Sequence, residues 1–363
     1  MEIKGLIAAG GKGTRLRPIT HTQNKHLIPI ANKPMLFYPI ETLANAGIKN
    51  IGIVVPPESE MEVKNVVGNG NKWGVKIEYI VQPYPGGLAH VIYVAKDFLG
   101  KSKFVFHLGD NIFKSGIEKP LKKFLDSNAN GLVTILKHEE NWRMGVPYFD
   151  KKGNLIDYKE KPENPPHKFC VPGIYFADHH IFECFEGKDK IKTSERGELE
   201  IPATFKYLLD HNYRVITCKI SGWWKDPGQM KDLIDVNRIV LDEFDGRKIE
   251  GEVDKKSTIV GDVIIEKGTK IINSKIRGPV VIGKNCIIKN SFIGPYTSIY
   301  HESKIVNSEI ENSVVLKGAL IEDVSGRIGD SLIGNFATVT KDKNGLPKVH
   351  NFLIGDNSTV DLL

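Results

Sequence analysis

Short apolar runs mark the first two-thirds of the chain, and each run ends at a glycine, a proline or a polar residue. The first four runs lie at residues 5–9, 51–55, 77–81 and 104–108. Segments with helical spacing of apolar residues, such as Met35 to Ala46, lie between them. This alternation predicts an α/β domain with a Rossmann-like, mostly parallel mixed sheet and helices on both faces. Later runs predict further strands, some of them antiparallel, at residues 131–137, 155–158, 173–176 and 214–220.

The last third of the chain has a different period. Isoleucines follow one another at intervals of six, six and five residues, so the repeat is 17 residues long, and the pair Asn-Ser recurs in the same phase. This pattern predicts a parallel β-helix, an all-β domain in which each triangular coil turns one side chain inward on every face. The isoleucines are Ile259, Ile265, Ile271, Ile276, Ile282, Ile288, Ile293, Ile299, Ile305 and Ile310. We therefore predict domains at 1–244 and 245–340, followed by a C-terminal cap or tail at 341–363.

A glycine-rich loop follows the first apolar run. Gly10, Gly11 and Gly13 let backbone N–H groups approach an anion, and Arg15 and Lys25 add charge nearby. A nucleotide polyphosphate is the guest that such a loop suits best. The spacing matches neither a Walker loop nor G-x-G-x-x-G, which disfavours a kinase or a dehydrogenase. The alternative is an ordinary glycine-rich turn between a strand and a helix.

Composition narrows the class of protein. The chain has 363 residues, of which 40% are hydrophobic and 26% charged, and its net charge of +6 is spread along the sequence. A nucleic-acid binder would instead cluster Lys and Arg in stripes, so we expect no nucleic-acid partner. No apolar stretch suits a signal peptide or a membrane span, so we expect a cytoplasmic protein without a membrane partner. Four scattered cysteines argue against a disulfide framework and a zinc site.

Several blocks along the chain occur in the order of a known family. The sequence resembles the sugar-1-phosphate nucleotidylyltransferases, and it closely resembles their glucose-1-phosphate thymidylyltransferase branch. The blocks that carry the resemblance are Gly10 to Pro18, Asn24 to Ile30, Gln82, Pro85 to His90, Leu108 to Asn111, Glu160 to Pro162, Arg196 to Glu200 and Gly222 to Asp226. The long form of this branch carries a left-handed β-helix, which matches the repeat of the last third.

The resemblance implies a reaction and its ligands. An enzyme of this branch transfers dTMP from dTTP to glucose-1-phosphate with Mg²⁺, and pyrophosphate leaves. Asp110 and Asp226 match the metal ligands of the family, although Asp110 would also suit a helix N-cap and Asp226 a turn. Arg15 and Lys25 match the catalytic residues that hold the triphosphate, and Lys161 matches the catalytic lysine on the sugar phosphate.

The remaining predicted contacts divide between the two substrates. Those on the nucleotide are Gly10, Gly11, Gly13, Thr14, Arg15, Gln82 and Gly87, and those on the sugar phosphate are Gly145, Glu160, Lys161, Gly173 and Arg196. For Gly145 and Gly173 an ordinary turn is the alternative. Two positions depart from the family: Pro227 stands where Thr is usual, and Ile201-Pro202-Ala203 stands for Ile-Thr-Asp. Both changes bear on the sugar pocket, because proline lacks a backbone donor.

Three classes of function stay open. The first is a sugar-1-phosphate nucleotidylyltransferase that uses dTTP and glucose-1-phosphate, or one that uses UTP or another hexose phosphate instead. The second is a bifunctional enzyme whose β-helix acetylates an amino sugar with His301 as general base. The third is a catalytically silent regulatory subunit that binds nucleotide sugars. The outer faces of a β-helix commonly pack against neighbouring subunits, so we also expect a homo-oligomer.

Overall fold

The computed structural model describes residues 2–341 and 354–361, and the chain forms two compact units. Unit 1 comprises Met1–Lys12 and Met35–Asp226, and unit 2 comprises Gly13–Pro34 and Pro227–Leu363. These units do not coincide with the predicted domains, because residues 13–34 and 227–244 group with the repeat region and not with the sheet. Most of the predicted cap, 341–363, lies outside the described residues. No helix within the described residues is long and apolar enough to cross a membrane.

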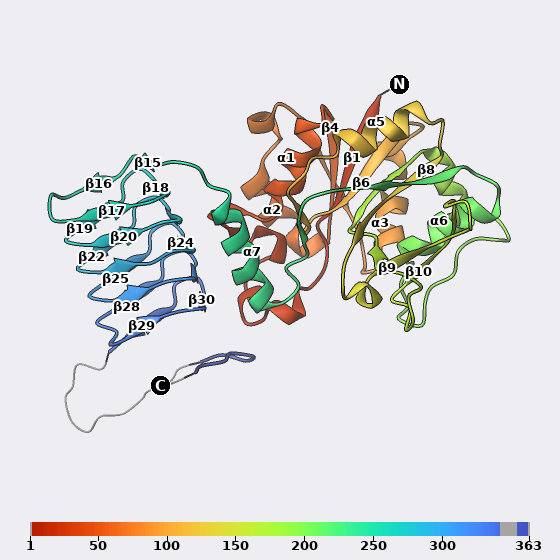
Figure 1. The fold of residues 1–363 in the computed structure, drawn as a ribbon. Coiled ribbons are helices and arrows are strands. Elements are labelled where there is room, and N and C mark those ends of the chain that lie inside the picture. Colours follow the sequence, from red (N-terminus) through yellow and green to blue (C-terminus); the bar gives the residue numbers. More distant parts are fainter. Residues whose placement is uncertain (1, 342–353, 362–363) are drawn as a thin grey trace. The chain divides into compact units, whose positions relative to one another are not determined.

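Unit 1 is built on a mixed eight-stranded sheet (Figure 1). Its strand order is β11-β8-β12-β6-β1-β4-β5, and β13 pairs with β8. All strands run parallel except β11 and β12, which confirms the predicted mostly parallel sheet. The strands are β1 (Ile3–Ala8), β4 (Asn50–Val55), β5 (Lys76–Val81), β6 (Lys103–Leu108), β8 (Gly131–Lys137), β11 (Phe169–Cys170), β12 (Ile174–Ala177) and β13 (Val215–Lys219).

Helices cover both faces of this sheet. Gly5 of β1 has no side chain, and a Cβ there would stand 2.8 Å from Leu43 of α1. The next residue, Leu6, packs instead with Val91 and Ile92 of α3. Successive side chains of a strand point to opposite faces, so α1 and α3 lie on opposite sides. The helices of unit 1 are α1 (Phe37–Asn45), α2 (Glu60–Val67), α3 (Leu88–Val94), α4 (Lys96–Leu99), α5 (Glu118–Asp126) and α6 (Ile201–Asp210).

Two small antiparallel ribbons complete unit 1. One pairs β7 (Ile112–Phe113) with β14 (Trp224–Lys225), and the other pairs β9 (Gly145–Phe149) with β10 (Leu155–Glu160). Each ribbon ends beside residues that the sequence predicts as functional. The ribbons therefore fix the site more directly than the sheet does.

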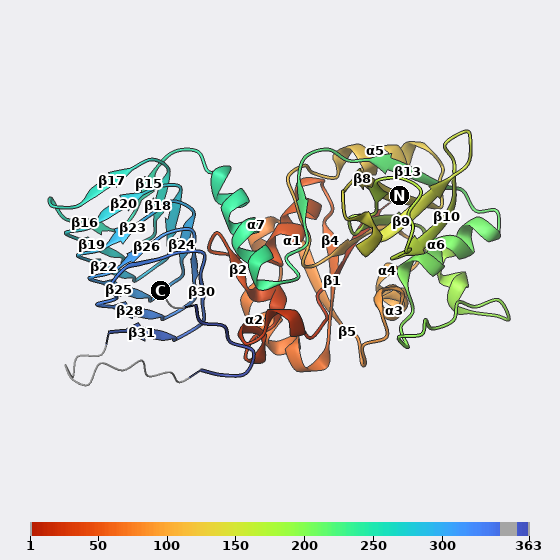
Figure 2. The same cartoon turned by 60° about the horizontal axis from the view of Figure 1, so that its bottom comes forward.

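Unit 2 contains the predicted parallel β-helix (Figure 2). Its strands form three parallel sheets, and the isoleucines of the repeat lie buried between them. The first sheet holds β15 (Lys248–Ile249), β18 (Val263–Ile265), β21 (Val280–Ile282), β24 (Thr297–Ile299), β27 (Val314–Val315) and β30 (Leu332–Ile333). The second holds β16 (Glu252–Val253), β19 (Lys270–Ile272), β22 (Ile287–Lys289), β25 (Lys304–Val306), β28 (Leu320–Glu322) and β31 (Thr338–Thr340). The third holds β17 (Thr258–Val260), β20 (Lys275–Arg277), β23 (Phe292–Ile293), β26 (Glu309–Ile310) and β29 (Arg327–Ile328).

Two further segments belong to unit 2. The first, residues 13–34, folds into three single 3₁₀ turns and a hairpin of β2 (Pro29–Ile30) with β3 (Lys33–Pro34). The second is helix α7 (Met230–Asp242), whose N-terminus is closed by a reciprocal capping box of Gln229 and Asp232. Helix α7 packs against both β2 and β24. The glycine-rich loop is therefore divided between the units, because Gly10 and Gly11 lie in unit 1 and Gly13 to Arg15 in unit 2.

Candidate active site

The two predicted metal ligands lie at the end of one ribbon. Asp110 lies in the turn between β6 and β7, and Asp226 directly follows β14. The ribbon is antiparallel and pairs Trp224 with Phe113 and Lys225 with Ile112. Continuing this register brings Asp226 opposite Asn111, the neighbour of Asp110. The ribbon thus brings two aspartates that are 116 positions apart in the sequence to the same end of one pair of strands.

Asn111 fixes the orientation of Asp110. Its Nδ2 donates to Oδ1 of Asp110 at 2.8 Å, and its own Oδ1 accepts from the indole Nε1 of Trp224 at 2.6 Å. Asn111 is only 2% exposed, so water does not readily replace these bonds. The sequence analysis did not select Asn111 or Trp224, although both lie in blocks that carry the family resemblance. Each is the neighbour or near neighbour of a predicted metal ligand.

Gly173 packs behind the same turn. Its carbonyl accepts from the amide of Leu108 at 3.0 Å, at the end of β6. Gly173 has a φ of +84°, and a Cβ there would stand 2.7 Å from Leu108 and 3.1 Å from Oδ1 of Asn111. A side chain would therefore strain the backbone and push on the residue that holds Asp110. Its predicted contact with sugar stays a prediction.

Glu160 and Lys161 lie at the end of the second ribbon. Glu160 pairs with Gly145, where a Cβ would stand 2.4 Å from the hydroxyl of Tyr158, so glycine at residue 145 leaves the space that the Tyr158 side chain occupies. Lys161 has a left-handed φ of 44°, and its Nζ lies 3.4 Å from Oε1 of Glu160. Left-handed backbone in a lysine is uncommon and is typical of functional sites.

The environment of Glu160 is electrostatically mixed. Burial raises the pKa of its carboxyl, Lys161 and Arg196 oppose that shift, and Glu200 adds to it. Arg196 and Glu200 thus lie within electrostatic reach of the ribbon end. The structure brings three of the predicted sugar-phosphate residues, Glu160, Lys161 and Arg196, into one neighbourhood.

Gln82 and Gly87 are linked to this neighbourhood. Nε2 of Gln82 donates to the carbonyl of Gly87 at 3.2 Å, while a Cβ on Gly10 would stand 3.4 Å from Oε1 of Gln82. Gly87 has a φ of +91°, and a Cβ there would stand 2.5 Å from the carbonyl of Leu199. The amide of Leu199 in turn donates to the carbonyl of Gly86 at 2.8 Å. The predicted nucleotide and sugar-phosphate segments of unit 1 therefore pack on each other.

The predicted triphosphate residues share unit 2. Gly13 has a φ of +56°, and a Cβ there would stand 2.9 Å from Thr20 and 3.0 Å from Lys25. The hydroxyl of Thr20 donates to the carbonyl of Gly13 at 2.7 Å, which closes this loop. Thr14 begins the first 3₁₀ turn, and the exposed side chain of Arg15 follows. The guanidinium of Arg15 lies beside Gly228, where a Cβ would be 3.2 Å away.

The two departures from the family have local explanations. Pro202 stands in the first turn of α6, where a missing backbone N–H costs no helical hydrogen bond. Pro227 is buried next to Gly228, the residue that leaves space for Arg15. Both prolines are compatible with the ligand set that the sequence predicts.

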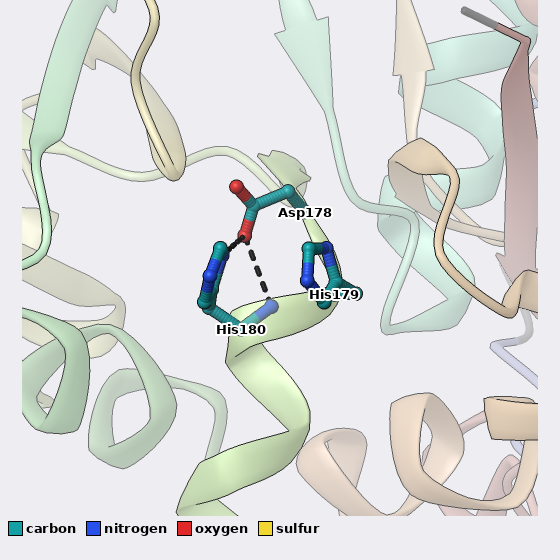
Figure 3. Close-up of side chains that lie close together, drawn as sticks. All are labelled: Asp178, His179 and His180. Carbon is teal, nitrogen blue, oxygen red and sulfur yellow. Dashed lines mark hydrogen bonds and ion pairs between the residues drawn. The ribbon is translucent and has the colours of Figure 1, made fainter.

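A second cluster of potential metal ligands lies elsewhere. Figure 3 shows Asp178, His179 and His180, whose ligand atoms lie within 4.8 Å of one another. Oδ1 of Asp178 accepts from the backbone amide of His180 at 3.0 Å and lies 2.9 Å from its Nδ1, while Oδ2 accepts from Asn130. Strand β12 runs antiparallel to its neighbour β6, so Asp178 and Asp110 lie at opposite ends of these strands. We therefore assign this cluster to capping of the 3₁₀ helix His179–Phe185.

His301 is held within the β-helix. Its Nδ1 accepts from the amide of Lys284 at 2.9 Å, and its ring lies against Tyr300 with the ring centroids 4.1 Å apart. Burial lowers the pKa of this imidazole. A neutral ring that accepts at Nδ1 carries its proton on Nε2, so neither nitrogen has a lone pair available for a proton. This geometry is unfavourable for a general base.

Known proteins are similar to this chain. The nucleotidyl transferase family matches residues 4–243. A glucose-1-phosphate thymidylyltransferase from Streptomyces antibioticus is 40% identical over 361 residues, which cover 99% of each chain. A nucleotidyltransferase of low-salt glycan biosynthesis from Haloferax volcanii is 38% identical over 362 residues, which cover 99% of this chain and 100% of its own.

A solved structure agrees with these relatives. A candidate glucose-1-phosphate thymidylyltransferase from Bacillus anthracis, in complex with sucrose, has a TM-score of 0.62 at 33% identity and covers 67% of this chain and 97% of its own. The chain described here therefore belongs to the nucleotidyl transferase family.

Proposed function

We propose that this enzyme transfers dTMP from dTTP to glucose-1-phosphate and releases pyrophosphate. In this reaction an oxygen of the sugar phosphate forms a bond to the α-phosphorus, and the bond from the α-phosphorus to the pyrophosphate oxygen breaks. The observation that carries the proposal is the ribbon of β7 with β14, because Asp110 and Asp226 lie at the same end of it. Relatives named glucose-1-phosphate thymidylyltransferase that align over the full chain support it.

Asp110 and Asp226 fit a magnesium ion. Mg²⁺ prefers oxygen donors and is commonly held by one or two carboxylates together with substrate phosphates. The ribbon end supplies two carboxylates, and the hydrogen bond from Asn111 orients one of them. A bound Mg²⁺ would neutralise phosphate charge as pyrophosphate departs. Asp110 and Asp226 are therefore the residues that we propose hold the ion.

Unit 1 would bind the sugar phosphate. The ammonium of Lys161 and the guanidinium of Arg196 suit a phosphate, and the carboxylate of Glu160 suits sugar hydroxyls as donors. Because burial raises the pKa of Glu160, this recognition should weaken as the pH falls and the carboxyl takes up a proton. The backbones of Gly145 and Gly173 would line the same side.

The predicted nucleotide contacts comprise one contact with the base and several contacts with the phosphates. Because Nε2 of Gln82 donates to Gly87, its Oε1 is the atom that we propose accepts from N3–H of a pyrimidine base. Thymine and uracil both carry that N–H, so this contact alone does not distinguish dTTP from UTP. Gly10, Gly11, Gly13 and Thr14 would contribute backbone to the phosphates, and Arg15 and Lys25 would contribute charge.

A pyrophosphate-release assay tests the proposal. Purified full-length protein with Mg²⁺ is incubated with every pairing of dTTP, UTP, ATP and CTP with glucose-1-phosphate, galactose-1-phosphate and glucosamine-1-phosphate. We expect the largest kcat/KM for dTTP with glucose-1-phosphate. A larger value for UTP or for another hexose phosphate would keep the reaction class and change the substrate. No release from any pair would contradict the proposal and favour the regulatory subunit.

Acetyl transfer and assembly need separate measurements. The relative GlmU of Methanocaldococcus jannaschii, described as bifunctional, is 35% identical over 332 residues, which cover 91% of this chain and 77% of its own. We propose that this β-helix does not acetylate, because Nδ1 of His301 accepts from the backbone. Acetyl transfer to glucosamine-1-phosphate that disappears in His301→Ala would contradict this.

Light scattering of the full chain tests the predicted homo-oligomer.

A further inference from the structure

The hairpin of residues 29–34 ends in a strained turn. Its two tip residues, Ala31 and Asn32, have left-handed φ values of 47° and 61°. A two-residue turn with both residues left-handed fits the twist of a hairpin, but it suits glycine and asparagine better than alanine. Contacts made by the rest of unit 2 must therefore stabilise Ala31 in this conformation.

Asn237 of helix α7 makes the central contact. Its Oδ1 accepts from the amide of Ala31 at 2.8 Å and from the hydroxyl of Ser298 at 2.8 Å. Its Nδ2 donates to the carbonyl of Tyr296 at 3.2 Å, and the side chain of Asn32 donates to the carbonyl of Ile299 at 2.7 Å. Asn237 is completely buried, so one amide joins the helix, the hairpin tip and strand β24.

The outer side of the first sheet of the β-helix is apolar and buried around Ser298. Ile264, Val281, Ser298, Val314 and Leu332 pair in register along its outer side, and the central three are at most 3% exposed. The outer positions of the second and third sheets carry charged residues such as Lys270, Lys275, Lys289, Lys304 and Arg327. Only the first of the three sheets therefore shows an apolar outer ladder with a serine at its centre.

The same segment is attached a second time, two coils further along. Nδ2 of Asn335 donates to Oε1 of Gln23 at 3.0 Å, and a Cβ on Gly334 would stand 3.3 Å from Ile19. Residues 13–34 thus extend over the coils that hold β24, β27 and β30. Lys25 lies between the two attachments, at the start of a 3₁₀ turn whose cap is Asn24.

We propose that this face of the β-helix positions Arg15 and Lys25 for nucleotidyl transfer, and that Asn237 is the positioning residue. The inference rests on the proposed function for the roles of Arg15 and Lys25, but the coupling itself is a property of the fold. The β-helix then acts as a scaffold for residues 13–34.

Two variants of the full chain test the coupling. Asn237→Leu keeps a similar volume and removes the acceptor for Ala31 and Ser298, and Ser298→Ala removes one donor and serves as the milder change. The matched control is Ser291→Ala, because Ser291 is also a buried serine of the β-helix, but its hydroxyl donates to the backbone carbonyl of Lys289 on another corner and not to Asn237. Hydrogen exchange of residues 25–34 is measured together with the kinetics of pyrophosphate release.

Exchange of residues 25–34 should be at least tenfold faster in Asn237→Leu and severalfold faster in Ser298→Ala, with Ser291→Ala unchanged. The kcat of Asn237→Leu should fall at least tenfold, while its KM for glucose-1-phosphate stays within twofold. Wild-type exchange in Ser298→Ala, or equally fast exchange in Ser291→Ala, would overturn the coupling. A wild-type chain without any transfer activity would instead refute the proposed function, and the exchange measurement would still decide the coupling.

Discussion

Trp224→Phe should weaken metal binding without touching a metal ligand. The substitution keeps an aromatic ring and removes the indole N–H that donates to Oδ1 of Asn111 at 2.6 Å. Asn111, in turn, donates to Asp110 at 2.8 Å. An amide that loses its partner on one side is free to rotate and can give up its bond on the other side.

The expected magnitude follows from burial. Asn111 is 2% exposed, and an unsatisfied buried acceptor costs about 1–3 kcal/mol. Only the part of this cost that reaches the ion through Asp110 lowers the metal affinity, so the lower part of the range, about 1–2 kcal/mol, applies. Since about 1.4 kcal/mol is a factor of ten, the metal affinity should fall roughly 5- to 30-fold.

The assay separates metal binding from turnover. Calorimetric titration of Mn²⁺ as a probe gives the affinity, and the Mg²⁺ dependence of pyrophosphate release gives the half-saturating concentration. The control is Trp73→Phe, which removes the indole donor to Glu41 in another part of unit 1. In Trp224→Phe the affinity for Mn²⁺ should fall and the half-saturating Mg²⁺ concentration should rise. Neither should change in Trp73→Phe.

The reasoning would be refuted by one clear result. If Trp224→Phe binds Mn²⁺ like the wild type and reaches half its maximal rate at the same Mg²⁺ concentration, the bonds through Asn111 do not position Asp110. A rise in the KM for the sugar phosphate alone would assign Trp224 to the substrate instead.

Three further predictions concern individual side chains. Asp110→Asn or Asp226→Asn should lose most of kcat, on the order of several kcal/mol in transition-state stabilisation, with unchanged thermal unfolding; near-wild-type turnover at limiting Mg²⁺ would contradict the ligand assignment. Lys161→Ala should raise the KM for glucose-1-phosphate far more than that for dTTP, whereas Arg15→Ala should lower kcat with both substrates saturating, and matching profiles would contradict this division. Burial lowers the pKa of His107 to about 4, so the unfolded chain binds a proton first and stability falls as the pH drops from about 6.5 towards 4. Over this pH range the wild type should lose about 3 kcal/mol more stability in urea unfolding than His107→Asn does.

The chain's local patterns determined the elements of the fold. The predicted strands at 51–55, 77–81 and 104–108 match β4, β5 and β6 to within one residue, because each is a run rich in apolar residues with a clear stop. The 17-residue repeat of isoleucines determined the β-helix, since a coil that turns one residue inward per face has to repeat with the period of the coil.

Tertiary structure alone decided how those elements are grouped. The sequence analysis placed residues 13–34 in the predicted catalytic domain. In the structure they group with the β-helix, and Asn237 and Ser298 form the contacts. A single buried asparagine in a helix gives no local signal of its partners, and these lie 206 and 61 positions away.

The candidate site divides in the same way. Asp110 and Asp226 were predicted because the sequence blocks that contain them resemble those of a known family. The link from Trp224 through Asn111 to Asp110 was not predicted, because it depends on a ribbon between segments more than 100 positions apart. Sequence patterns specify which residues a strand turns inward, whereas the hydrogen-bond partners of a buried polar side chain are fixed only when distant segments pack together.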